Sequence, residues 1–191
     1  PDSYRRGWLS GLSEEEGARH PTRGGLRIGK PLPERAPEMP YDELTEWDRD
    51  GQYWHYLTRW MEALSRAAVI LGEPQYQRQA VELAQAAFPR FLKTSSSGAP
   101  IGLAWKMSVD LSRPQIGSIS PHDALDGYVT FRGLGRGRSE TGLAEEPATL
   151  LRLSEGQDWS MRDPLGLGGL LQAAVRLALL PDRNARDDGL I

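Results

Sequence analysis

Residues 50–88, DGQYWHYLTRWMEALSRAAVILGEPQYQRQAVELAQAAF, decide the fold that the sequence predicts. Apolar residues recur here every three or four positions, which predicts amphipathic helices over about 50–71 and 74–92. Asp50 is expected to cap the first helix, and Gly72 is expected to end it. Because only a short turn separates the two helices, they should form an antiparallel hairpin.

Three further helices are expected along the rest of the chain. Ser120 is the predicted N-cap of the first, and the others should span 147–153 and 164–180. The last is apolar almost all round, which predicts that it is buried. β-Branched and aromatic residues near 100–112 predict a short extended or β-hairpin arm. Since strands do not alternate with helices, we expect an all-α fold of helical hairpins rather than a doubly wound sheet.

The composition divides the chain into three parts. Residues 1–40 are rich in proline and glycine, which predicts an extended arm on the surface, with disorder as the alternative. The alternating apolar residues at 26–32 favour an arm that packs on the domain over a disordered one. Residues 41–181 form the expected helical domain and 182–191 a tail. Because the chain begins with Pro1 rather than Met and ends without a closing element, a fragment of a longer protein is one interpretation.

Charge and cysteine content exclude several classes of partner and site. The net charge is −3, so nothing favours a nucleic acid or an anionic membrane as partner. There are no cysteines, which excludes disulfides and thiolate metal sites and fits a cytoplasmic protein. No apolar run approaches the length of a membrane span. Asp48 and Asp50 match only part of a calcium-loop pattern, so no metal is expected. No P-loop or GxGxxG motif follows a predicted strand, and no cofactor is expected.

Several stretches together resemble a known family. The hairpin at 50–88, with its LGEPQY turn and its alanine-rich second helix, is similar to the repeating unit of the (α/α)6 toroids. Residues 105–131, WKMSVDLSRPQIGSISPHDALDGYVTF, resemble an arm and inner helix of such a barrel, and 162–180 resemble a further helix. These toroids include the six-hairpin glycosidases and the N-acylglucosamine 2-epimerase-like enzymes. The resemblance implies about half a barrel, or a smaller helical domain that uses the same hairpin.

Four carboxylates are candidates for catalysis. Asp48 and Asp50 precede the first hairpin helix, while Asp123 and Asp126 lie at the start of a later one. In the barrel that the resemblance implies, the N-termini of inner helices converge on one end, so these groups could meet in a cleft. Carboxylates about 6.5–9.5 Å apart would support inverting glycoside hydrolysis. The alternative is that Asp50 and Asp123 simply cap helices.

Two histidines offer a second chemistry. His55 and His122 each lie in the first turn or two of a predicted helix. Facing each other across a pocket, they could move a proton next to a sugar carbonyl, as a 2-epimerase does, because imidazole titrates near neutrality. The alternatives are a buried hydrogen-bonded His55 and a solvent-exposed His122.

Aromatic and polar side chains near these groups are candidates for substrate binding. Sugars stack their C–H faces on aromatic rings, while neighbouring charged side chains bind their hydroxyl groups. The candidates from the helix start and the following arm are Trp47, Tyr53, Trp54, Trp105, Lys106, Asp110 and Arg113. Tyr53 could instead be core, and Arg113 could instead tie the arm to the helices through backbone carbonyls.

The sequence therefore predicts a carbohydrate-active enzyme that acts on a small saccharide. Glycoside hydrolysis by the paired carboxylates is the leading hypothesis, and sugar 2-epimerisation or isomerisation by the histidines is the second. A non-catalytic helical module that only binds a partner is the alternative from another class. A half-barrel would expose the apolar face of residues 165–180, which favours self-association.

Overall fold

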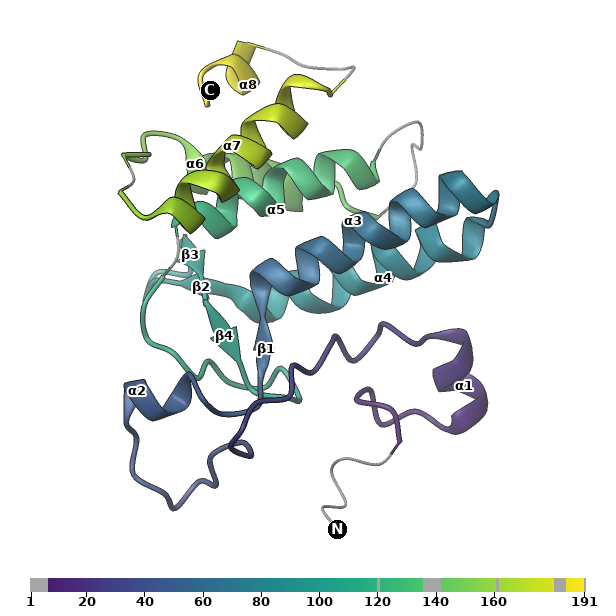
Figure 1. Ribbon diagram of the computed structural model, residues 1–191, viewed down its shortest axis with the longest axis vertical. Coiled ribbons are helices and arrows are strands. Elements are labelled where there is room, and N and C mark those ends of the chain that lie inside the picture. Colours follow the sequence, from purple (N-terminus) through teal and green to yellow (C-terminus); the bar gives the residue numbers. More distant parts are fainter. Residues whose placement is uncertain (1–6, 120, 136–141, 161, 181–184, 191) are drawn as a thin grey trace.

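The computed structural model describes residues 7–119, 121–135, 142–160, 162–180 and 185–190. The predicted predominance of helix is confirmed in these residues (Figure 1). The helices are α1 (Glu14–Arg19), α2 (Glu43–Glu46), α3 (Trp54–Leu71), α4 (Pro74–Phe91), α5 (Pro121–Leu134), α6 (Glu146–Ser154), α7 (Pro164–Ala178) and α8 (Ala185–Asp188). The strands are β1 (Gln52–Tyr53), β2 (Leu92–Thr94), β3 (Pro100–Leu103) and β4 (Lys106–Met107). None of the helices in these ranges is long and apolar enough to cross a membrane.

The predicted hairpin is confirmed as α3 and α4, which lie side by side in Figure 1. Gly72 ends α3 in the left-handed conformation with φ 68°, which is the usual role of glycine at this position. Helix α5 packs against α3, and α6 packs against α5. The core lies between these helices, and its aromatic centre consists of Trp54, Phe88, Phe91 and Phe131.

The predicted start of the first hairpin helix is wrong. Helix α3 begins at Trp54, because Gln52 and Tyr53 form β1 and pair antiparallel with Met107 and Lys106 of β4. Asp50 caps no helix: its buried carboxylate pairs with Arg27 and accepts a hydrogen bond from a backbone N–H of the N-terminal arm. Contacts with segments far away in the sequence therefore override the local capping pattern.

The two arms of the chain lie near where they were expected. Strand β3 pairs with β2, and β4 pairs with β1, so the extended arm near 100–112 is confirmed. The N-terminal arm packs on the domain through bridges of Ile28 to Gly51 and of Leu32 to Arg49. It also contains the short helix α1, which the sequence analysis did not predict. The predicted cap at Ser120 lies outside the described residues.

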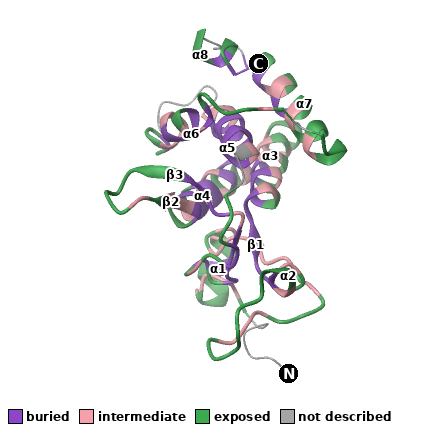
Figure 2. Cartoon of the chain, turned by 90° about the vertical axis from the view of Figure 1, so that its left-hand side faces the viewer, coloured by how far each residue is buried: buried purple, intermediate pink, exposed green. Residues whose placement is uncertain are grey.

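The predicted burial of the last long helix is wrong. Helix α7 buries only Ala173 and Leu177, while Leu165 is 85% exposed and Val175 is 58% exposed. Figure 2 shows α7 coloured mainly as exposed and intermediate. Only one narrow stripe of α7 packs against α5. The apolar sequence of α7 is therefore not matched, within the described residues, by a second element that covers its other faces. The self-association expected from the sequence would cover this face and stays a prediction.

Candidate functional site

An aromatic cluster lies at the N-terminal end of α3 and consists of Trp47, Tyr53, His55, Tyr56 and Trp105. Trp105 meets Trp47 edge to face, with ring centroids 5.2 Å apart, and Trp47 stacks on Tyr53 at 6.3 Å. Tyr53 also contacts the rings of Tyr56 and His55, at 5.6 and 5.8 Å. Tyr53 is buried and forms the floor, whereas the other four rings are partly exposed.

Polar groups surround this cluster. Asp48 is exposed, and Lys30 and Lys106 place their ammonium groups 5.3 and 5.1 Å from the Tyr53 ring centroid. The Tyr53 hydroxyl donates a hydrogen bond to the backbone carbonyl of Trp47. Burial, together with nearby Tyr56 and Asp48, raises the pKa of Tyr53 to about 12, so its hydroxyl stays protonated at neutral pH.

Buried charges hold the loop that carries Trp47 and Asp48. Glu46 pairs with Arg35 at 2.7 Å, and Asp50 pairs with Arg27 at 2.6 Å. Lys106 is completely buried and donates to the backbone carbonyls of Glu46 and Arg49. Because unmatched buried carbonyls and charges are unfavourable, these contacts fix the shape of the loop.

The burial of Lys106 leads us to expect an unusual dependence of the free energy of unfolding on pH. Burial, opposed by Glu46, lowers its pKa to about 8, below its ordinary value of 10.5. Between these values the unfolded chain binds more protons than the folded chain, so the free energy of unfolding should rise with pH. We expect a rise of roughly 1–2 kcal/mol from pH 8 to pH 9.5 in urea unfolding curves.

Lys106→Met provides the control for this prediction, because it removes the titrating group and keeps an unbranched side chain. A rise of the same size in Lys106→Met would show that other groups cause it. A fall in stability over this pH range in the wild-type chain would contradict the assigned direction.

The remaining polar candidates from the arm serve the structure. Lys106 was predicted to bind substrate, but its ammonium group is buried beneath the loop and engaged with carbonyls. Arg113 pairs with Glu34 and donates to the carbonyl of Arg35, so it ties this arm to the N-terminal arm rather than to the helices. Asp110 is exposed and accepts hydrogen bonds within its own turn.

The start of α3 and the start of α5 lie against each other. The Trp54 indole donates to the backbone carbonyl of Asp123 at 2.8 Å, and Thr58 donates to the Asp126 carboxylate at 2.5 Å. Asp126 also pairs with Arg176 at 2.9 Å and with Arg59 at 3.1 Å. The structure thus brings residues 54–58 to Asp123 and Asp126, while Asp50 is held by the N-terminal arm.

Trp54 does not face a substrate, so its predicted binding role is corrected. Its side chain has no exposed surface and touches the rings of Phe88, Phe91 and Phe131. Trp54 is the first residue of α3 and shares its buried face with Leu57 and Met61, so it lies in the interior between α3, α4 and α5.

The two histidines lie in different surroundings. His55 is half-buried and contacts Tyr53 and Tyr56, and burial lowers its pKa while nearby Asp126 opposes that shift. His122 lies against Trp159, with ring centroids 5.9 Å apart, and burial lowers its pKa too. Both rings are therefore neutral at pH 7. His55 contacts the tyrosines of the aromatic cluster, whereas His122 contacts Trp159.

The sequence analysis missed a network of charges beside Asp126. Glu62 pairs with Arg59, Arg66 and Arg176, and Arg176 also donates to Thr130. The i,i+3 and i,i+4 spacings within α3 could have revealed the first two pairs. The third pair, between Glu62 and Arg176, was indicated only by the presence of a single charged residue in an otherwise apolar helix.

Among the residues described, no group of three histidine, aspartate or glutamate side chains is placed to hold a metal ion. Comparison of the chain with protein-family models, with curated proteins and with solved structures found no match. The geometry of the aromatic cluster and its polar neighbours is therefore the basis for a functional proposal.

Proposed function

We propose that the chain is a carbohydrate-active enzyme built from (α/α)-toroid-type hairpins, and that a saccharide binds on the aromatic cluster. The observation that carries the proposal is the run of contacting rings from Trp105 through Trp47 and the buried Tyr53 to Tyr56, of which all but Tyr53 are partly exposed. Four partly exposed rings, with the Asp48 carboxylate and the Lys30 ammonium group near Tyr53, suit a ligand that is apolar on its faces and polar at its rim.

The reaction that this arrangement supports best is proton transfer next to the carbonyl of an open-chain sugar. His55 lies in the cluster as a neutral imidazole and can accept the proton from C2 of the sugar. Delivery of that proton to C1, with the O2 proton passing to O1, gives the ketose. Delivery of a proton to the opposite face of C2 by solvent water, with the resulting hydroxide taking the proton held by His55, gives the epimer. No cofactor is required, because the proton is only moved.

The positions of the carboxylates support glycoside hydrolysis less well than the position of His55 supports proton transfer. Asp126 is engaged with two arginines and a threonine, and Asp50 with Arg27, so both act as anchors of the fold. Asp48 is the candidate acid that lies exposed beside the cluster. Hydrolysis with Asp48 as the acid is therefore the second candidate.

Deuterium exchange in D₂O tests the proposal. With D-glucose, D-mannose and N-acetylglucosamine as probes, we expect the C2–H signal of one sugar to decay in proton NMR spectra. His55→Gln should lower kcat by about 10²-fold or more, because the base is lost. Trp47→Ala should raise KM about tenfold through lost stacking, while Trp60→Ala, which removes an exposed ring outside the cluster, should change neither.

Other outcomes would decide against this reaction. Exchange that persists in His55→Gln but is lost in His122→Gln would assign the base to the other histidine. Release of reducing sugar from oligosaccharides that is lost in Asp48→Asn would favour hydrolysis. Absence of exchange, hydrolysis and saccharide binding, the last measured by calorimetry, would leave the non-catalytic helical module.

A further inference from the structure

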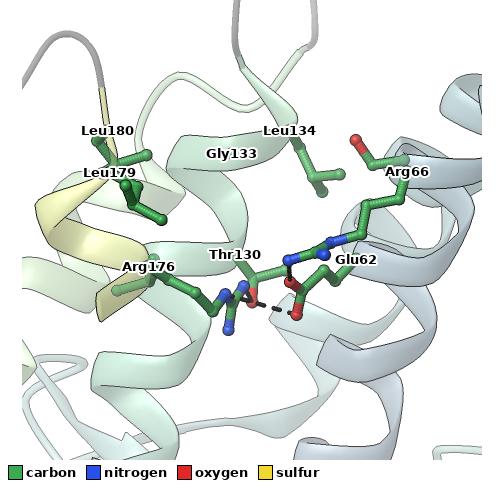
Figure 3. Close-up of a pocket in the computed structure, with 10 residues that line it drawn as sticks. Glu62, Arg66, Thr130, Gly133, Leu134, Arg176, Leu179 and Leu180 are labelled. Carbon is green, nitrogen blue, oxygen red and sulfur yellow. Dashed lines mark hydrogen bonds and ion pairs between the residues drawn. The ribbon is translucent and has the colours of Figure 1, made fainter. Parts of the chain in front are cut away.

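A cavity of about 160 Å³ lies between α3, α5 and α7, away from the aromatic cluster (Figure 3). One side is polar and consists of Glu62, Ser65, Arg66, Thr130 and Arg176. The other side is apolar and consists of Val129, Leu134, Leu179 and Leu180. Arg66 and Leu179, both 69% exposed, border it, so a small molecule can reach it from solvent.

Positive charge is in excess around the polar side. Figure 3 shows Arg176 reaching Glu62 from α7, and Arg66 reaching it from one turn further along α3. Arg59 also approaches Glu62, at 3.4 Å, and shares Asp126 with Arg176. Within the described part of the chain, three arginines thus surround two carboxylates, which favours an added anion.

Arg66 is the arginine that can bind this anion. The three nitrogens of Arg176 already contact Asp126, Thr130 and Glu62. Arg66 uses one terminal nitrogen for Glu62, at 2.6 Å, and the rest of its guanidinium lies at the border of the cavity. A guanidinium has five N–H donors in a fixed fork, so Arg66 can keep Glu62 and still hold a carboxylate.

Size and lining define the rest of the ligand. A cavity of about 150 Å³ lined by apolar side chains can hold a benzene-sized molecule. Here the apolar part of the lining comes from Val129, Leu134, Leu179 and Leu180. We propose that this cavity binds a small organic monocarboxylate, with its carboxylate on Arg66 and its apolar body, up to the size of one six-membered ring, against the leucines.

Calorimetric titration with sodium benzoate at constant ionic strength tests this inference, which is independent of the proposed reaction. Gly133 lines the cavity, and a Cβ there would meet no atom within 4 Å, so Gly133→Met should fill the space and weaken benzoate binding at least tenfold. Gly168→Met is the matched control, because Gly168 is a helical glycine with equally open surroundings on α7 and should bind as the wild type does.

The charge is tested in the same way. Arg66→Met should weaken benzoate binding at least tenfold, whereas Arg90→Met, at an exposed arginine of α4, should leave it unchanged. Should Gly133→Met fail to fold, Ser65→Leu fills the cavity from α3. Absence of saturable benzoate binding would overturn the proposal. The proposal would also be overturned if inorganic phosphate bound as tightly as benzoate and if neither filling variant weakened phosphate binding. A contact of either anion with the protein surface would then explain the binding of both.

Discussion

Trp54→Ala is expected to lower the free energy of unfolding by about 4 kcal/mol, because it removes the largest ring of the core. Trp54 has no exposed surface and contacts three phenylalanine rings. The substitution also removes the indole donor and leaves the buried carbonyl of Asp123 without that hydrogen bond. Urea unfolding followed by circular dichroism measures the difference.

Trp60→Ala is the control for this effect. Trp60 lies on the same helix but is 47% exposed, so its loss should change the free energy of unfolding by less than about 1 kcal/mol. If Trp54→Ala kept the wild-type stability but lost saccharide binding, the residue would belong to the binding surface and the assigned core would be wrong.

Arg176→Met is expected to destabilise the fold by about 3 kcal/mol. The substitution removes one partner from each of two largely buried carboxylates, Asp126 and Glu62, and buried charge that loses part of its compensation is unfavourable. The effect stays below that of Trp54→Ala because Arg59 and Thr58 remain bound to Asp126.

The same variant should loosen α7 before the rest of the fold. Helix α7 buries only Ala173 and Leu177, so the contacts of Arg176 are a large part of its attachment. Hydrogen exchange measured by mass spectrometry should show faster exchange in α7 than in α3. Uniform exchange across both helices would contradict this, and Arg90→Met, which removes an exposed arginine, should leave both helices unchanged.

Much of the fold could be predicted because local patterns determine it. The α3–α4 hairpin follows from helical periodicity and from Gly72, and the arm near 100–112 follows from its β-forming residues. The start of α3 could not be predicted from local capping, because pairing with Lys106 and Met107 extends the chain through Tyr53. The exposure of α7 could not be predicted either, since apolar composition does not specify a neighbour.

The candidate site was predictable in its residue types more than in its geometry. The clustering of Trp47, Tyr53 and His55 follows from their closeness in sequence, and Trp105 joins them through the pairing of β1 and β4. The carboxylate of Asp50 pairs with Arg27 of the N-terminal arm instead of capping α3. Such long-range ion pairs leave no periodic signal in the sequence.

Besides hydrogen bonds within residues 42–49, the loop that carries Trp47 and Asp48 is held by segments outside it. Its anchors are Arg27 and Arg35 from the N-terminal arm, and Lys106 and Gln115 from beyond the hairpin. Contacts of this range form late in folding, because the intervening chain must first be ordered. Saccharide binding at this loop, as proposed above, would therefore require the complete fold, and we expect a nascent or partly folded chain to bind no sugar.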